Sequence, residues 1–148
     1  MIYETAEHRA AQEKAANEVA AFHGCTAIHM PTLGSFDALF REDRRIAGAC
    51  EVKVRDATRY RYPDVWVNVG TVWRIRLAHA CRSFDPYVDW LGLIAIQWND
   101  ALVAIPIDAV VGYPKALRSL TNPRDEGDLN NPVYLVATRD PRWRLVTL

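Results

Sequence analysis

Two short segments with alternating side chains, on either side of a charged turn, constrain the fold of this chain most. GSFDALFR (residues 34–41) and IAGACEVKV (residues 46–54) flank the turn Glu42-Asp43-Arg44-Arg45, a pattern that predicts a β-hairpin. Successive side chains point to opposite faces of a strand. One face of the predicted hairpin is wholly apolar, and we expect it to face the core: Phe36, Ala38, Phe40, Gly48, Cys50, Val52 and Val54.

The opposite face of the predicted hairpin carries its charged side chains. Its members are Ser35, Asp37, Leu39, Arg41, Ala47, Ala49, Glu51, Lys53 and Arg55. If the hairpin turns about position 44, Asp37 lies directly opposite Glu51. Two facing carboxylates repel each other unless a cation lies between them. We therefore expect either a divalent ion or the ammonium group of Lys53 beside this pair.

The ligand chemistry of this face points to a metal ion and a phosphate. Carboxylate oxygens without histidine or cysteine favour Mg²⁺ or Mn²⁺ over zinc, and Mg²⁺ commonly takes one or two carboxylates together with water and substrate phosphate. Such an ion would polarise a scissile phosphate, while Lys53 would orient the nucleophile or stabilise charge developing on phosphorus. The pattern predicts metal-assisted hydrolysis of a phosphodiester. A surface salt bridge between Lys53 and the two acids is the alternative.

The same residues resemble the PD-(D/E)XK nuclease superfamily, which includes restriction endonucleases, archaeal-type Holliday junction resolvases and repair nucleases. The resemblance covers roughly residues 3–84 and rests on GSFDALF followed by GACEVKVRD. It implies a restriction-endonuclease-like core with a catalytic lysine at Lys53. It also implies that Asp37 and Glu51 are metal ligands, and that the backbone carbonyl of Val52 can be a further one.

The chain departs from the family pattern at one position and leaves a fourth site residue open. The residue before the family's first acid is often proline and here is Phe36, while the literal Pro63-Asp64 pair follows the lysine and is interpreted as a decoy. Resolvase-like members also use a glutamate of the first helix, a role for which Glu13 and Glu18 compete. We favour Glu13, which begins an ExxA pattern eleven residues before Gly24. An ordinary solvated helix glutamate is the alternative for each.

The remaining patterns predict an α/β (α+β) domain with a mixed sheet flanked by helices. We expect one domain over residues 1–148, with elements in the order α-β-β-β-α-β-β. The expected elements outside the hairpin are a helix from Tyr3 to about Phe22 ended by Gly24, a strand over 25–30, a long loop over 55–68, a helix from about Gly70 to Phe84, apolar strands over 91–98 and 101–107 around Asn99-Asp100, a polar surface loop over 121–132, and closing strands over 133–139 and 142–148.

Each predicted helix has an apolar stripe that we expect to be buried. In the first helix the stripe consists of Ala11, Ala15, Val19 and Phe22. In the second it consists of Val69, Trp73, Leu77, Ala80, Cys81 and Phe84. This spacing places Trp73 in the core rather than on a surface that stacks against bases. The three cysteines are widely separated and in no CxxC arrangement, so we expect buried free thiols.

Basic residues are concentrated around the predicted site, although the formal net charge is zero. Residues 41–82 hold ten basic and five acidic groups, and nine of the ten cations are arginines, whose planar fork suits phosphate. The candidate DNA-phosphate ligands are Arg55, Arg59, Arg61, Arg74 and Arg76. Tyr60 and Tyr62 interleave with them, as in surfaces that stack on unpaired bases. A solvated arginine-rich surface and loop aromatics that merely cover the sheet are the alternatives.

The leading hypothesis is a Mg²⁺- or Mn²⁺-dependent DNA endonuclease or exonuclease, of resolvase-like or repair type, working as a homodimer. A nucleic-acid-binding module on the same fold that does not cleave is the second hypothesis, and a small interaction domain with purely structural hairpin acids is the third. The sequence has no apolar run long enough for a membrane helix and no signal-peptide core at its start. We therefore expect a cytoplasmic protein, with phage, plasmid or cellular origin left open.

Overall fold

The computed structural model describes residues 5–31, 36–82, 90–118 and 131–148. Tyr3, Ser35, Phe84 and residues 121–130, for which the sequence also carries expectations, lie outside them. No helix in these ranges is long and apolar enough to cross a membrane. The described elements are α1 (Ala6–Phe22), β1 (Thr26–His29), β2 (Ala38–Glu42), β3 (Arg45–Val54), β4 (Asp64–Asn68), α2 (Val69–Arg82), β5 (Leu91–Gln97), β6 (Leu102–Pro106), α3 (Ile107–Val110), β7 (Lys115–Arg118), β8 (Asn131–Ala137) and β9 (Arg144–Thr147).

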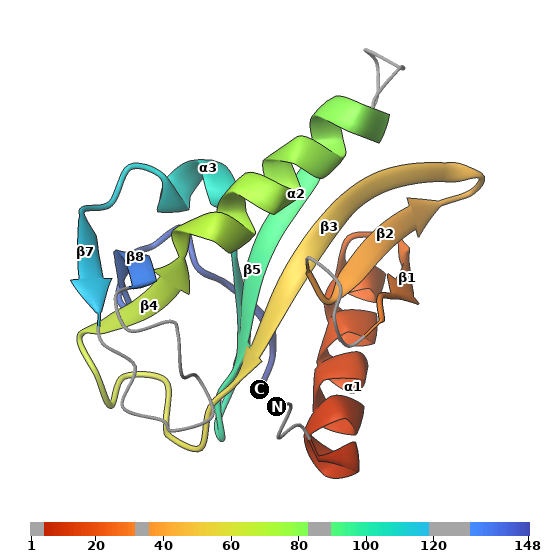
Figure 1. Cartoon of the computed structure of the whole chain (residues 1–148). Coiled ribbons are helices and arrows are strands. Elements are labelled where there is room, and N and C mark those ends of the chain that lie inside the picture. The colour runs from red at the N-terminus through yellow and green to blue at the C-terminus, as the bar shows by residue number, and fades with distance from the viewer. Residues whose placement is uncertain (1–4, 32–35, 83–89, 119–130) are drawn as a thin grey trace.

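A mixed six-stranded sheet forms the centre of the molecule, with strand order β1-β2-β3-β5-β6-β9. The pair β3 and β5 is parallel, and every other neighbouring pair in this sheet is antiparallel. Helix α1 covers one face, and α2 lies on the other side of the sheet together with a small second sheet (Figure 1). The predicted fold class, a mixed sheet flanked by helices, is confirmed.

Helix α1 packs through small side chains, which allow it to approach the sheet closely. It begins after Thr5, whose hydroxyl accepts a hydrogen bond from the His8 backbone N–H at 3.1 Å, and it ends before Gly24, whose φ of +73° suits glycine. The predicted stripe is correct at Ala15 and Val19 but wrong at Phe22, which is 48% exposed because it lies at the helix end. The buried residues of the helix are Ala15, Ala16, Val19 and Ala20.

The β2–β3 hairpin has the predicted register over the part that approaches the site. Ala38 pairs with Cys50, Leu39 with Ala49, and Phe40 with Gly48. The register then shifts by one residue between Phe40 and Arg41, so the end nearest the turn contains a β-bulge. Asp43 at the turn has a φ of +53°, which aspartate tolerates better than most residues. The bulge lies at the far end from Asp37 and leaves its predicted alignment unchanged.

Both faces of the hairpin contain buried residues, the predicted core face and also part of the face that carries the charged side chains. Ala38, Phe40, Cys50 and Val52 pack under α1 as predicted. On the opposite face Leu39 and Ala49 are also buried, in the cluster that includes residues of α2. Phe36 belongs to this second cluster rather than to the first, because it precedes β2 and does not follow the strand alternation. The charged residues of the hairpin therefore lie on the same face as the buried residues Leu39 and Ala49.

Helix α2 turns a different face to the core from the one that the sequence predicts. Val72 and Ile75 are fully buried, whereas Trp73 is 55% and Leu77 is 62% exposed. The prediction failed because apolar residues occur on two sides of this helix, so spacing alone did not decide which side packs inward. Trp73 is a surface residue, and the expectation that it lies in the core was wrong.

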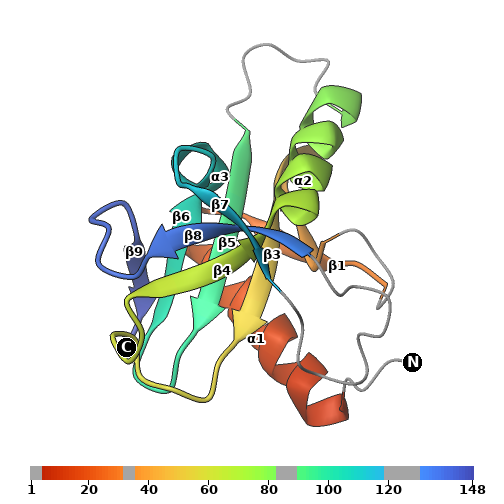
Figure 2. The ribbon, with the colours of Figure 1, turned by 60° about the vertical axis from the view of Figure 1, so that its left-hand side comes forward.

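The small second sheet was not predicted. It has the order β4-β8-β7, is antiparallel, and packs β4 and β8 against the central sheet through Val65, Val67, Tyr134 and Val136 (Figure 2). Residues 64–68 are therefore strand β4 and not part of a long loop. Their partner strand is more than 60 residues away in sequence, and Pro63 directly before β4 suggested a loop. Helix α3 and strand β7 are likewise additions to the predicted order.

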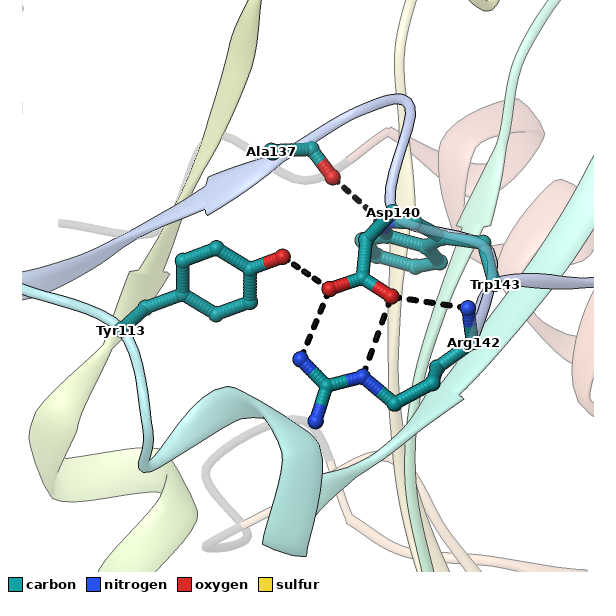
Figure 3. A network of polar contacts seen from close by, with 5 residues as sticks. All are labelled: Tyr113, Ala137, Asp140, Arg142 and Trp143. Atoms are coloured by element: carbon teal, nitrogen blue, oxygen red, sulfur yellow. Dashed lines mark hydrogen bonds and ion pairs between the residues drawn. The ribbon is translucent and has the colours of Figure 1, made fainter.

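A polar network ties the turn after α3 to the turn between β8 and β9 (Figure 3). The carboxylate of Asp140 accepts hydrogen bonds from the Tyr113 hydroxyl and from the Arg142 backbone N–H at 2.7 Å, Nε at 3.0 Å and Nη2 at 2.8 Å. Trp143 Nε1 donates to the Ala137 carbonyl at 2.8 Å. The positive charge and donors of Arg142 hold the pKa of Asp140 well below its usual range.

Candidate active site on the central hairpin

Asp37 lies immediately before β2 and is fixed by its backbone and by its side chain. Its backbone N–H donates to the Cys50 carbonyl at 3.1 Å, which continues the β2–β3 pairing by one residue. Its carboxylate Oδ2 accepts a hydrogen bond from the Val52 backbone N–H at 2.6 Å. The carboxylate is thereby held against the strand that carries Glu51 and Lys53, which is the relationship that the hairpin register predicts.

Glu51 lies in the middle of β3, where strands β2 and β5 flank it on either side. The pKa of Glu51 is raised to about 7: burial is the largest cause, and the negative charge of Asp37 is the second. A hydrogen bond between the two side chains acts in the same direction, while the positive charges of Lys53 and Arg74 lower the pKa. A negative charge on Glu51 is thus disfavoured beside Asp37, and a cation between the two carboxylates would relieve this repulsion.

Lys53 follows Glu51 by two residues and therefore lies on the same face of β3. Burial is the main cause that lowers the pKa of Lys53, and the positive charge of Arg55 adds to it. The carboxylates of Glu51 and Asp37 oppose this shift. The ammonium group is therefore held out of bulk water, within electrostatic reach of both acids.

The two candidate helix glutamates point to different parts of the molecule. Glu13 lines a small cleft together with Asp37, and the Arg9 guanidinium holds its carboxylate with an Nε–Oε1 distance of 3.2 Å. Glu18 instead accepts a long hydrogen bond from the Thr147 hydroxyl on β9, at 3.5 Å. Glu13 therefore shares a cleft with Asp37, whereas Glu18 contacts the last strand of the sheet.

Gln12 is a residue of this region that the sequence analysis missed. Its Nε2 donates to the carbonyl oxygen of Val52 at 3.4 Å, and it lines the same cleft as Glu13 and Asp37. The Val52 carbonyl is the group that the family resemblance implies as a ligand. A glutamine in an alanine-rich helix carries no signal of its own, because its role depends on where α1 crosses β3.

Among the predicted DNA-binding arginines, Arg74 is the one whose charge acts on Glu51. It lies in the second turn of α2 and lowers the pKa of Glu51. Arg76 is engaged elsewhere, with its Nη2 atom 3.4 Å from Asp108 Oδ1. Arg55 continues β3, and its backbone N–H donates to the Gln97 carbonyl at 2.9 Å.

Arg59 and Arg61 belong to the loop after β3 and lie against tyrosine rings. The guanidinium carbon of Arg59 is 4.9 Å from the centre of the Tyr60 ring, and that of Arg61 is 5.8 Å from the centre of the Tyr62 ring. These distances are in the range of cation–π contacts. The interleaved pattern of arginine and tyrosine in the sequence therefore corresponds to stacked pairs on the protein surface.

Cys25 and Cys50 are free thiols. Cys50 is fully buried on the α1 side of the hairpin, and burial together with the charges of Asp37 and Glu51 raises its pKa well above the usual value. Burial also raises the pKa of Cys25, which is half-buried. Both side chains stay protonated at neutral pH.

Comparison with protein-family models and with curated protein sequences finds no match. The structure is similar to that of a Holliday junction resolvase. That protein is Hjc from Archaeoglobus fulgidus, an archaeal hyperthermophile, with 14% sequence identity and a TM-score of 0.48. The similarity covers 84% of this chain and 82% of Hjc. At this identity it assigns no activity and no residue roles to this chain.

The donor set on the hairpin fits a hard divalent cation better than it fits zinc. Within the described part of the chain, no group of three or more His, Cys, Asp or Glu side chains is arranged to hold a metal ion. Two carboxylates, those of Asp37 and Glu51, do meet, and Mg²⁺ commonly binds to one or two carboxylates with water and phosphate completing its shell. The Asp37 charge raises the pKa of Glu51, which is the effect expected where a positive charge between the two carboxylates would be favourable.

Proposed function

We propose that this chain is a metal-dependent nuclease that hydrolyses DNA phosphodiester bonds at Asp37, Glu51 and Lys53. The observation that carries the proposal is the pairing of two half-buried carboxylates across the β2–β3 hairpin, with Lys53 next along the same face. Burying like charges side by side destabilises a fold unless the site binds a cation. Such an arrangement is typical of a functional site.

Asp37 and Glu51 would hold Mg²⁺ or Mn²⁺, with the Val52 carbonyl and the Glu13 carboxylate as further oxygen ligands. When bound, such an ion supplies Lewis-acid polarisation of a scissile phosphate. The Val52 N–H keeps the Asp37 carboxylate oriented toward Glu51. Gln12 supports the Val52 carbonyl from α1. The ligand oxygens would thus be held by backbone as well as by side chains, which limits the reorganisation needed at the site.

Lys53 would act on the reacting phosphate directly. Its ammonium group donates hydrogen bonds from Nζ, and in a site withdrawn from water these bonds stabilise negative charge that develops on phosphate oxygens. The lowered pKa of Lys53 also makes proton exchange at Nζ with an attacking water easier than for an exposed lysine. Arg74 adds a second positive charge on the same side of the site.

DNA phosphates would follow the arginines that extend from this site. Arg74 lies beside the acids, and Arg55, Arg59 and Arg61 continue from the end of β3. The Arg59 guanidinium lies over the Tyr60 ring, with its central carbon 4.9 Å from the ring centre. We include Arg76 as an outer contact. Together they position a backbone without reading its sequence, as expected of a resolvase-like or repair nuclease.

We also propose that the nuclease works as a homodimer. The exposed Trp73 and Leu77 are separated by one turn of α2 and lie on the same side of this helix. Large apolar side chains gathered on a surface mark interaction sites more often than scattered ones do. The partner that we propose for this surface is a second copy of the chain. A two-fold dimer has two identical active sites, one for each of the two DNA strands to be cut.

Cleavage assays with point variants test the proposed chemistry. The purified protein should cut at least one of duplex, single-stranded, flapped or four-way DNA in the presence of Mg²⁺ or Mn²⁺. Asp37→Asn and Lys53→Met should lower the rate by about 100-fold or more, because each removes a charge that acts on the reacting phosphate. Lys14→Met, at an exposed lysine of α1, is the matched control. Equal cleavage by wild type and by both site variants would reject the proposal.

A non-catalytic nucleic-acid-binding module is the second candidate. The observation in its favour is that, among the described residues, two rather than three acidic side chains meet at the hairpin. DNA binding that is unchanged by EDTA, together with no cutting of any of the four DNA forms, would favour this reading.

A further inference from the structure

A cavity of about 440 Å³ begins where β3 ends, and the strand that leads to it carries Glu51 and Lys53. Its lining begins at Arg55, two residues beyond Lys53, and continues through Asp56 and Ala57. Alternation along the strand places Lys53 and Arg55 on the same face, with their Cα atoms roughly 7 Å apart. The lining of the cavity therefore starts at the residue that follows Lys53 on the same side of the strand.

Aromatic rings form much of the cavity surface. Two of the aromatic residues that line it are partly open to solvent: Tyr62 is 55% exposed and Trp66 is 45% exposed. Trp98 lines it as well and is itself buried in the core beneath. Aromatic side chains beside a basic surface stack on nucleobases with little dependence on sequence, because every base offers a π-face.

The wall of the cavity is held in place by hydrogen bonds to distant parts of the chain. The buried Thr138, which directly follows β8, donates from its hydroxyl to the Tyr62 carbonyl at 2.8 Å and from its backbone N–H to the Pro63 carbonyl at 3.0 Å. The loop after β3 is also attached to the β5–β6 turn, where the Asn99 N–H donates to the Ala57 carbonyl at 2.9 Å (Figure 1). A wall held in this way loses little freedom when a ligand binds.

Polar groups at the cavity match both parts of a nucleotide. Arg55 contributes guanidinium donors, which suit phosphate, and Asp64 contributes a carboxylate, which accepts hydrogen bonds from the amino groups of bases. Arg61 holds its positive charge 5.8 Å from the centre of the Tyr62 ring. The Pro63-Asp64 pair, which has no part in the metal site, thus lies on the wall of this cavity.

We propose that this cavity binds one unpaired nucleobase of the DNA strand whose phosphate lies at Lys53. The inference deepens the proposed nuclease function and rests on it for the position of the phosphate. A base that is stacked and paired in a continuous duplex cannot enter the cavity without being extruded, which costs free energy. The protein should therefore favour DNA that presents an unpaired nucleotide at the cleavage point, as single strands, flaps and junctions do.

Fluorescence of 2-aminopurine tests the cavity without any cleavage. A single-stranded oligonucleotide with one central 2-aminopurine is titrated with protein in EDTA, and stacking of this base on an aromatic ring should quench its emission. Trp66→Ala should remove most of the quenching and weaken binding about tenfold, while Trp66→Phe should retain both. Phe22→Ala is the matched control, because Phe22 is an aromatic residue at the end of α1 that is 48% exposed and does not line this cavity.

The outcomes separate this inference from the proposed function. Quenching that depends on Trp66 supports the cavity even if no DNA form is cut with Mg²⁺ or Mn²⁺. Quenching unchanged in Trp66→Ala, or reduced equally in Phe22→Ala, overturns the inference even if cleavage is efficient. Melting temperatures of the three variants within a few degrees of wild type show that the comparison is made on folded protein. If Trp66→Ala does not fold, Tyr62→Ala is tested in its place. Loss of quenching in Tyr62→Ala then supports the inference, and full quenching in that variant overturns it.

Discussion

The carboxylates of Asp37 and Glu51 share a hydrogen bond across the β2–β3 hairpin, and this contact raises the pKa of Glu51. Asp37 is held from the other side by the Val52 N–H, so it cannot move away without losing a bond of 2.6 Å. The two acids are therefore kept together by the backbone against their mutual repulsion. A cation bound between the two carboxylates would remove this repulsion and so stabilise the folded protein.

Replacing Glu51 with glutamine should stabilise the metal-free protein. At pH 8 Glu51 is ionised and repelled by Asp37, whereas glutamine has nearly the same shape and no charge, so the free energy of unfolding should rise by roughly 1 kcal/mol. Thermal denaturation in EDTA measures this change. Addition of Mn²⁺ should raise the melting temperature of the wild type but not that of Glu51→Gln. A variant that is less stable than wild type in EDTA would contradict the account of the pair as repulsive.

Glu13 and Glu18 offer a direct test of the fourth site residue. Glu13→Gln should lower the rate of DNA cleavage by about tenfold or more, because Glu13 shares a cleft with Asp37. Glu18→Gln should cleave as wild type, because its carboxylate lies beside Thr147 on the last strand. Single-turnover rates at saturating Mn²⁺ compare the two. If Glu18→Gln cleaves slowly and Glu13→Gln cleaves at the wild-type rate, Glu18 and not Glu13 is the fourth site residue.

The part of the site that sequence could predict is the part made by local structure. Asp37, Glu51 and Lys53 meet because one hairpin brings them together, and the alternation of side chains gives the register of a hairpin directly. Strand β4 was missed because its partner β8 is far away in sequence and no local pattern reports such a pairing. Nothing local distinguishes Gln12 from the other polar residues of α1, since its role depends on where the helix crosses β3.

Helix α2 illustrates a different reason for failure. Its sequence offers apolar residues on two sides, and only the packing of the second sheet against the central sheet decides that Val72 and Ile75 turn inward. The side with Trp73 and Leu77 has an equally good apolar pattern and is exposed. A spacing rule can find an apolar stripe, but it cannot tell a stripe that fills a core from one that forms a surface for a partner.

The Asp140 network should contribute stability that disappears in acid. The pKa of Asp140 is lowered in the folded protein, chiefly by its hydrogen bonds to Arg142, so the unfolded chain binds the proton more tightly than the folded one. The contribution is present above the ordinary aspartate value of 3.8 and is lost as the pH falls below it. Asp140→Asn should lower the melting temperature at pH 7 by about 3 °C.

Melting curves of wild type and Asp140→Asn between pH 7 and pH 2 measure this effect. The difference in melting temperature should shrink as the pH falls below 4. Asp108→Asn is the control, because the Asp108 carboxylate is 88% exposed and its ion pair with Arg76 is long, at 3.4 Å. A difference that is the same at pH 7 and pH 2 would show that the charge of Asp140 does not matter to the network.

Charge placed on the exposed side of α2 should separate the proposed dimer. Leu77→Glu puts a carboxylate on a surface that the dimer would bury, and an unpaired buried charge costs several kcal/mol, so the variant should be a monomer at concentrations where the wild type is a dimer. Sedimentation velocity measures the state of each protein. Leu145→Glu, at a leucine of β9 that is 42% exposed, is the matched control and should not change the oligomeric state seen for the wild type.

Because Leu77 is already 62% exposed, the fold of the monomer should tolerate Leu77→Glu with little loss of stability. A wild type that sediments as a monomer at every concentration would remove the dimer from the proposal and leave α2 as a surface for DNA or for another protein.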